Sequence, residues 1–210
     1  MSMVASPAEQ RVVLDHISWS TYLAILKDAE GCRGRIAYDR GVLEIMSPSK
    51  VHEHIKRLIG RMIEAFTEEL NIAIESASAT TFKREDMERG FEPDECYYIQ
   101  HAAQMRAKDH IDMTVDPPPD LILEVDISGS SLNKFGIYRA LGIPEVWRYD
   151  GVALRLYVLH DAGYLEVQRS TVLPQFPIAQ LNFCLTQRSV LGETQLIRQF
   201  RTWVCETFQV

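Results

Sequence analysis

The sequence predicts an α/β fold in which a mixed central sheet is flanked by helices, with an added N-terminal hairpin and a C-terminal meander. A strand, a helix and a second strand follow one another over residues 120–149, the order that gives a parallel pair with a right-handed crossover. Residues 50–70 show a strong helical period, and a glycine turn joins two apolar runs within residues 35–46. Because a domain takes roughly 150 residues, a chain of 210 residues is expected to form one domain, over 1–210.

The N-terminal half is expected to hold two helices and a hairpin. Residues 18–29 begin with serine caps and carry apolar residues at helical spacing, so they predict a first helix that ends near Gly31. The runs 35–38 and 42–46 flank Asp39-Arg40-Gly41, the pattern of a hairpin. After the break at Ser47-Pro48-Ser49, residues 50–70 predict the longest amphipathic helix of the chain.

The remaining elements follow from apolar runs and turn residues. The strand beginning at Asp120 is apolar on both faces in its middle, which is typical of a central strand. Ser128-Gly129-Ser130 provide the turn and cap of the helix that follows it. The predicted segments are strands at 72–82, 95–100, 120–127 and 145–149, a charged turn at 84–90, a helix at 131–141, a meander punctuated by Asp150-Gly151 and 161–163, and a closing helix at 193–208.

Composition excludes several classes of protein. With 46% hydrophobic and 24% charged residues the chain can form a core, and its formal charge of −7 argues against a protein that holds nucleic acid through one large cationic surface. The four cysteines, Cys32, Cys96, Cys184 and Cys205, contain no CxxC pair, so we expect reduced thiols rather than a zinc site or disulfide framework. Residues 1–14 have no apolar signal-peptide core, and no segment is apolar enough for a membrane span. We therefore expect a soluble cytoplasmic protein.

The residues most suited to chemistry are carboxylates on the central strand. The chain has no GxGxxG, GxxxxGK[ST], HExxH or GxSxG motif, and two histidines two positions apart, as in His52-Glu53-His54, diverge on a regular helix. Strand alternation places Asp120, Glu124 and Asp126 on one face. Asp120 and Glu124 are about 13 Å apart along the strand, too far to bind one small cation together. A buried ion pair or a strand-end cap is the structural alternative for these acids.

Asp94 is the natural partner for Glu124. Pro93 keeps the approach to the strand at 95–100 extended, so that the Asp94 carboxylate projects from its start. Two carboxylates within about 4–5 Å repel by roughly 4 kcal/mol at an effective dielectric near 20, a cost that a divalent metal removes. Lys134, in the first turn of the next helix, could lean over the end of the strand and assist a nucleophile, although a solvated lysine is the simpler alternative.

These residues resemble the PD-(D/E)XK nuclease superfamily. More narrowly, the stretches RIAYDRGVLEIMSPS, HEHIKRLIGRMI, TTFKREDMERGFEPDECYYI and PPPDLILEVDISGSSLNKFGIYRALGIPEVWRYDG resemble the family of putative restriction endonucleases abundant in cyanobacteria. The similarity covers about residues 15–205. It implies a restriction-endonuclease-like fold and metal-dependent hydrolysis of DNA phosphodiester bonds.

The resemblance also implies roles for individual residues. Asp94 and Glu124 would bind a divalent cation, Mg²⁺ or Mn²⁺. The superfamily lysine normally stands two residues after Glu124, where this chain has Asp126, so Lys134 would replace it. An acidic residue on the first core helix often joins the site. Glu53 matches that residue type, whereas helical spacing puts His52 on the sheet-facing side, which favours His52.

Several alternatives stay open on sequence alone. Tyr138, one turn after Lys134, is expected to pack rather than react. Asp120 or Asp126 could join the site. The main rival function is a catalytically inactive DNA-binding or regulatory module that keeps the nuclease fold, and a third is hydrolysis of RNA or a small phosphoester. Because cutting both DNA strands needs two sites, a homodimer is expected, with Trp203 and Phe208 as candidate interface residues.

Overall fold

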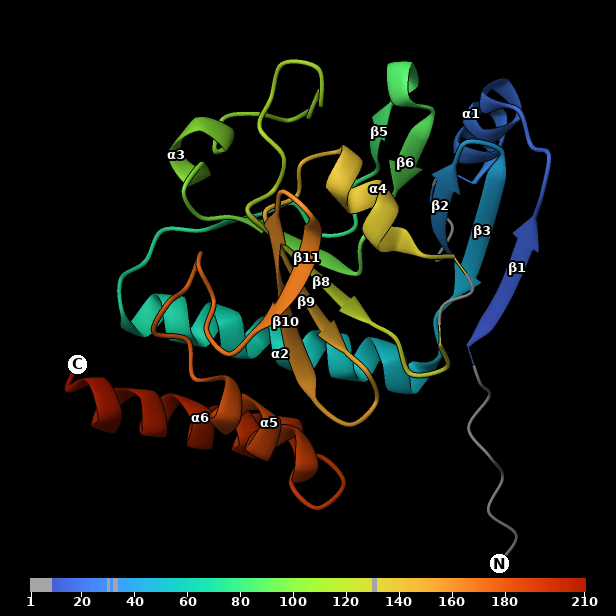
Figure 1. Ribbon diagram of the computed structural model, residues 1–210. Helices are drawn as coiled ribbons and strands as arrows, with labels where there is room; N and C mark the ends of the chain where they lie inside the picture. Colours follow the sequence, from blue (N-terminus) through green and yellow to red (C-terminus); the bar gives the residue numbers. More distant parts are fainter. Residues whose placement is uncertain (1–8, 30, 32–33, 130–131) are drawn as a thin grey trace, which may run out of the picture.

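The computed structural model describes residues 9–29, 31, 34–129 and 132–210, which form two β-sheets with helices around them (Figure 1). The smaller sheet is antiparallel, with the order β1-β3-β2-β6-β5, and the larger one is mixed, with the order β11-β10-β9-β8-β7-β4. The mixed α/β fold predicted from the sequence is therefore confirmed.

The described elements have the following bounds. The smaller sheet contains β1 (Gln10–Leu14), β2 (Arg35–Asp39), β3 (Val42–Ser47), β5 (Phe82–Arg84) and β6 (Arg89–Phe91). The larger sheet contains β4 (Glu75–Ser76), β7 (Glu95–Tyr98), β8 (Leu121–Val125), β9 (Glu145–Tyr149), β10 (Leu154–His160) and β11 (Gly163–Val167). The helices are α1 (Trp19–Asp28), α2 (Lys50–Glu69), α3 (Ala102–Met105), α4 (Lys134–Ala140), α5 (Ile178–Thr186), α6 (Glu193–Phe208) and a 3-10 turn, η1 (Glu85–Met87).

The central strand β8 is buried on both faces, as its sequence predicts. Leu121, Leu123 and Val125 belong to the main core, which they share with α2, α5 and α6. Ile122 points the other way, into a second core that includes Ile137 and Tyr138 of α4. Figure 1 shows α2 along one side of the sheet and α4 on the other. Helix α4 thus lies on the face of β8 that also carries Glu124.

Local turn chemistry fixes the hairpin of the smaller sheet. Arg40 and Gly41, the two residues between β2 and β3, both have positive φ, 45° and 96°. This is the backbone of the two-residue turns that match the twist of paired strands, and glycine adopts it without strain. The hairpin pairs Asp39 with Val42, as expected, and β1 adds to the outer edge of β3.

The structure corrects one expected strand and adds elements that were not expected. Residues 72–82 do not form one strand: only β4 and the first residue of β5 lie there, because the intervening chain turns away between the two sheets. Helix α5 and strand β1 were not predicted. Trp203 and Phe208 are partly buried against the main core, and whether they contribute to an interface stays a prediction.

Several expectations concern residues outside the described ranges. Cys32 and the Ser130-Ser131 cap lie there, as do residues 1–8; helix α4 begins at Lys134, with Asn133 as its N-cap. The other cysteines are free thiols, with Cys96 and Cys184 buried. No helix among the described residues is long and apolar enough to cross a membrane.

Candidate active site

The candidate site lies where β8 ends, opposite the residue that precedes β7. The antiparallel ladder pairs Glu95 with Leu123 and Cys96 with Ile122, and extending it by one residue sets Asp94 opposite Glu124. Directly opposed residues of an antiparallel pair have Cβ atoms about 4.5–5.5 Å apart. The Val125 amide donates to Asp94 Oδ2 at 2.8 Å, which fixes the carboxylate on the end of the strand. The two acids singled out by the sequence are therefore neighbours.

The buried Asp94 carboxylate is held by His52 of α2. Ser49 caps this helix by accepting from the His52 amide, which sets the ring on the buried side of the first turn. His52 Nε2 lies 2.8 Å from Asp94 Oδ1, and Nδ1 lies 2.6 Å from Glu9 Oε1. Burial disfavours the charged imidazole, but the bonds to Asp94 and Glu9 outweigh it and raise the pKa of His52 to about 9. The ring is therefore a cation that donates to both carboxylates.

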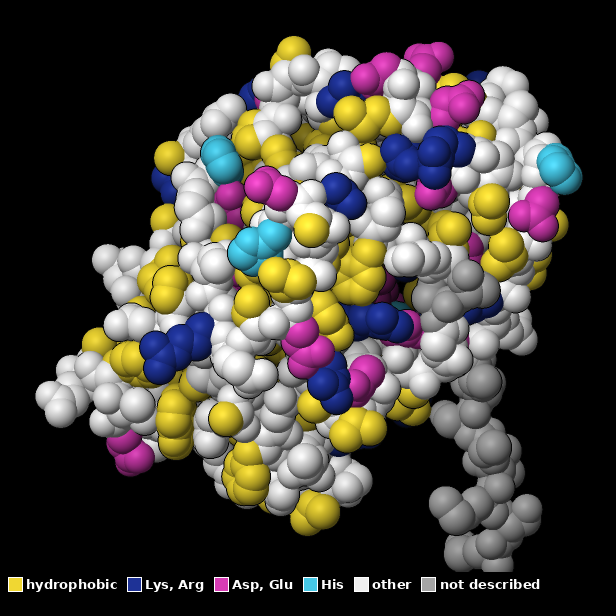
Figure 2. Space-filling model, in the orientation of Figure 1, with side chains coloured by type: hydrophobic (Ala, Val, Ile, Leu, Met, Phe, Trp, Pro, Cys, Tyr) yellow, Lys and Arg dark blue, Asp and Glu magenta, His cyan; other side chains and the backbone are white. Residues whose placement is uncertain are grey.

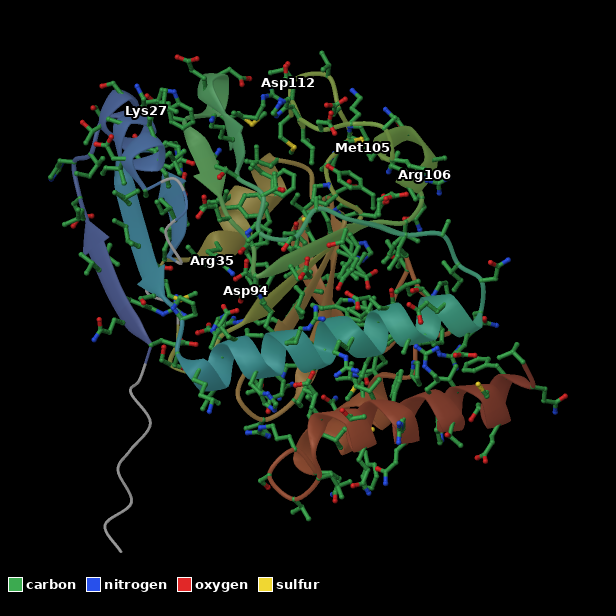
Figure 3. All side chains as sticks on the ribbon, turned by 180° about the vertical axis from the view of Figure 1, so that it is seen from behind. Lys27, Arg35, Asp94, Met105, Arg106 and Asp112 are labelled. Carbon is green, nitrogen blue, oxygen red and sulfur yellow. The ribbon has the colours of Figure 1, made fainter. Side chains whose placement is uncertain are left out.

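Glu53, the alternative to His52, points outward. Its side chain is 41% exposed and contacts Lys56 at 3.1 Å and Arg35 at 3.6 Å. Arg35 also lies 3.6 Å from Asp94, and Figure 3 labels the two residues side by side beside the start of α2. His52 is thus the residue of the first helix that reaches Asp94, as the helical period predicts, whereas Glu53 approaches only through Arg35.

Glu124 is held by two side chains of α4. Lys134 Nζ donates to Glu124 Oε2 at 3.0 Å, and Tyr138 Oη donates to Oε1 at 2.7 Å. Lys134 and Tyr138 are four residues apart, so one helix face presents both groups to the strand. Lys134 therefore reaches the site, and Tyr138, expected only to pack, also contacts the acid.

The pKa values of Asp94, Glu124 and Lys134 are all shifted by burial and by neighbouring charges. Burial and the nearby Asp94 raise the pKa of Glu124, although Lys134 and Tyr138 oppose the shift. Burial also opposes ionisation of Asp94, but His52 and Lys134 more than compensate and lower its pKa. For Lys134, burial favours the neutral amine, yet Glu124 and Asp94 outweigh it and raise the pKa. Asp94 raises the pKa of Glu124, and Lys134 lowers the pKa of both acids, so the three groups lie in one electrostatic environment.

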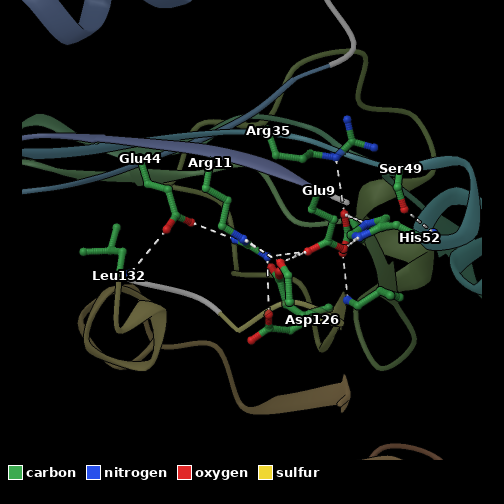
Figure 4. A network of polar contacts seen from close by, with 12 residues as sticks. Glu9, Arg11, Arg35, Glu44, Ser49, His52, Asp126 and Leu132 are labelled. Atoms are coloured by element: carbon green, nitrogen blue, oxygen red, sulfur yellow. Dashed lines mark hydrogen bonds and ion pairs between the residues drawn. The ribbon is translucent and has the colours of Figure 1, made fainter. Parts of the chain in front are cut away.

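Asp126 and Asp120 have other partners. Asp126, at the position of the superfamily lysine, forms an ion pair with Arg11 of β1 (Figure 4) and another with Arg148 of β9. Asp120 lies at the opposite end of β8, where its carboxylate accepts from the backbone amides of Ile99 and His101 and contacts the His101 ring at 2.7 Å. Asp126 therefore borders the site, and Asp120 is a structural cap.

Besides Arg35, sequence reasoning did not identify four residues that contact this network, Glu9, Arg11, Glu44 and Arg148. Arg11 contacts Glu9 at 3.1 Å, Glu44 at 3.2 Å and Asp126 at 3.3 Å (Figure 4). Arg148 is the fourth. An acid in an apolar strand, such as Glu44 between Leu43 and Ile45, indicates that a basic side chain pairs with it, but the sequence does not identify that side chain.

The acid pair fits a divalent cation as a partial ligand set. Carboxylate oxygens are the ligands that Mg²⁺ prefers, and Mg²⁺ is usually bound by one or two carboxylates together with water and substrate phosphates. Among the described residues no group of three or more His, Cys, Asp or Glu side chains is arranged to hold a metal. Asp94 and Glu124 would therefore supply two ligands at most. Glu124, together with Lys134 and Tyr138, also lines a cavity of about 250 Å³, whereas Asp94 does not.

Comparison with known proteins gives one family match. The model of the family Uma2, described as putative restriction endonuclease, matches residues 19–188. No curated protein matches the chain.

Proposed function

The chain belongs to the Uma2 family of putative restriction endonucleases, and from this premise we propose that it is a divalent-metal-dependent endonuclease that hydrolyses phosphodiester bonds in DNA. One observation carries the proposal: Asp94, Glu124 and Lys134 come from three different segments and meet at the end of β8. Two acids and a lysine are a set that can bind a metal and also manage the charge of a phosphate.

Each residue has a role that follows from its contacts. Asp94 and Glu124 would hold Mg²⁺ or Mn²⁺, which when bound polarises the phosphate and lowers the pKa of water. His52 fixes the orientation of Asp94, and Tyr138 fixes that of Glu124. Lys134 Nζ, 3.0 Å from Glu124, can orient a water nucleophile and offset negative charge that develops on phosphorus.

The proposal is tested with purified protein, Mg²⁺ or Mn²⁺, and supercoiled plasmid DNA. We expect nicking or cutting that EDTA prevents and that Glu124→Gln reduces at least 100-fold, because this change removes a metal-binding charge while keeping the side-chain shape. Glu206→Gln makes the same change on an exposed face of α6 and should cut like the wild type. Circular dichroism would verify that both variants fold. Equal cutting by Glu124→Gln and the wild type would contradict the proposal.

The rival function is an inactive nuclease fold that only binds DNA. Two features favour this rival. The whole chain has a net charge of −7, and Asp126 stands where the superfamily normally has a lysine. Calorimetric titration with Mn²⁺ separates the two functions. The endonuclease should bind the ion in the wild type and much more weakly in Glu124→Gln, whereas the inactive module should show no difference.

Cutting of both strands would require two sites. We therefore expect two copies of the chain on one duplex. Sedimentation with a short DNA duplex measures this directly, and a complex of one chain that still cuts both strands would exclude the dimer.

A further inference from the structure

We propose that Arg148 binds a phosphate of the DNA backbone beside the acid pair, and that Asp126 holds its guanidinium in place. The inference deepens the proposed function, because it names how this site takes a polyanionic substrate. Arg148 has no assigned role, and the acid at position 126 is otherwise unexplained in a site that should attract phosphate.

The sheet places Arg148 beside the acids. Strands β8 and β9 are parallel, and their register pairs Glu124 with Arg148. Arg148 and Lys134 both line the cavity of about 250 Å³ that Glu124 borders. A phosphate that approaches Glu124 and Lys134 through this cavity therefore passes the guanidinium of Arg148.

Among the described residues, Arg11 and Arg148 both pair with Asp126, and Arg148 is the more accessible of the two. Arg11 is 11% exposed and contacts three carboxylates, those of Glu9, Glu44 and Asp126. Its charge is therefore already compensated. The Arg148 side chain is 36% exposed, and its only ion pair with the described residues joins Nη2 to Asp126. Its other N–H groups can donate to a ligand, because a guanidinium has five such donors.

Charge explains why such a residue is needed. The molecule has a net charge of −7, and the site contains several carboxylates. A phosphate is therefore repelled unless positively charged side chains lie close to where it binds. Figure 2 shows basic and acidic side chains interspersed over the visible face rather than one broad basic surface. A guanidinium suits phosphate because its planar fork can donate two hydrogen bonds. An arginine held by a buried carboxylate keeps that fork aimed at the cavity.

The experiment measures binding of a labelled DNA duplex by fluorescence anisotropy in EDTA, where metal-dependent cutting cannot occur, at several salt concentrations. For Arg148→Gln, which retains a donor for Asp126, we expect Kd to rise about tenfold through loss of a charge-assisted bond. The slope of log Kd against log salt should fall by about 0.9, the value for one phosphate contact. Arg148→Lys should lie between Arg148→Gln and the wild type.

The matched control is Arg198→Gln, which makes the same change at an exposed position of α6. It should bind DNA like the wild type. Unchanged affinity and salt slope in Arg148→Gln would overturn the inference, as would equal losses in both variants or no duplex binding by the wild type. If the wild type binds DNA through Arg148 but does not cut it with Mg²⁺, the proposed endonuclease activity is contradicted and the role of Arg148 is not. Loss of cutting in Glu124→Gln with normal binding in Arg148→Gln would contradict the arginine's role alone.

Discussion

The candidate site is a set of paired charges, most of them buried, rather than an isolated acid pair. Among the described residues, five acidic side chains meet five basic ones at or beside the end of β8. His52 is included with the basic ones because its contacts with Asp94 and Glu9 outweigh burial and raise its pKa to about 9. These residues are Glu9, Glu44, Asp94, Glu124 and Asp126, with Arg11, Arg35, His52, Lys134 and Arg148. Removing one member of such a set leaves its partner charged and buried, which costs more than the pair itself contributes.

Lys134→Met tests this balance at the residue scale. The variant leaves Glu124 buried next to Asp94 without its ammonium, so the free energy of unfolding should fall by about 2–4 kcal/mol at pH 7. DNA cutting should be lost. Urea denaturation measures the stability. Mn²⁺ should restore more stability to this variant than it adds to the wild type, because the metal replaces the missing cation. A variant as stable as the wild type without metal would contradict the ion-pair role of Lys134.

At the scale of elements, close packing joins α1 to the smaller sheet. Gly90 of β6 faces the buried Tyr22 of α1, and a Cβ atom at position 90 would stand 2.1 Å from Tyr22 Oη. Backbone and ring therefore approach each other as closely as glycine permits. The ring of Tyr22 is also stacked on Tyr38 of β2, at 4.8 Å between centroids. The Tyr22 ring is thus confined between Gly90 and Tyr38.

Two glycine substitutions should accordingly have opposite effects. Gly90→Ala should lower the free energy of unfolding by about 2–3 kcal/mol, because the added methyl displaces Tyr22. Gly136 lies on the exposed side of α4, where the nearest neighbour of an added Cβ atom would be 3.9 Å away. Gly136→Ala should raise stability by up to about 1 kcal/mol, since alanine favours the helix. Thermal unfolding measures both, and equal melting temperatures would contradict the packing argument.

Elements with strong local signals were predictable from the sequence, and those made by distant contacts were not. Residues 193–208 form α6 with the expected bounds, and the parallel pairing of β8 with β9 follows from their order along the chain. Helix α5 lacks charged residues and follows Pro177, so its sequence shows no charged face of the kind that marks a surface helix. Strand β1 exists only because it pairs with β3.

The same distinction applies to the site. Three site residues could be proposed from local signals. Asp94 follows a proline, Glu124 lies in a central strand, and Lys134 lies in the first turn of the next helix. Glu9 and Arg11 could not, because their partners His52 and Asp126 are 43 and 115 residues away. Composition and periodicity carry no information about such pairs.

At the scale of the whole molecule, stability should decline in acid through carboxylates whose pKa is lowered by folding. Asp150, in the turn between β9 and β10, accepts from the amides of Val152 and Ala153 and from Arg155. Burial opposes its ionisation, but these donors outweigh it and lower the pKa of Asp150 to about 2. The unfolded value is about 3.9, so the contribution is complete above that pH and is lost as the pH falls towards 2.

Asp150→Asn measures this contribution. The side chain is one-third exposed, so solvent screening reduces the effect to about 1 kcal/mol of lost stability at pH 7. The difference from the wild type should shrink at pH 2.5, where the wild-type carboxylate is itself partly protonated. Asp161→Asn, in the next exposed turn, should match the wild type at both pH values. A deficit for Asp150→Asn that is the same at both pH values would contradict the assignment.

The site draws its charged side chains from positions 9 to 148, and this spread has a consequence during synthesis. The ribosome must release β9 before Arg148 can join Asp126, and β8 before Glu124 can face Asp94. A nascent or prematurely terminated chain lacking these strands cannot assemble the constellation. If the proposed endonuclease activity depends on this constellation, it can arise only after most of the polypeptide has been translated and folded.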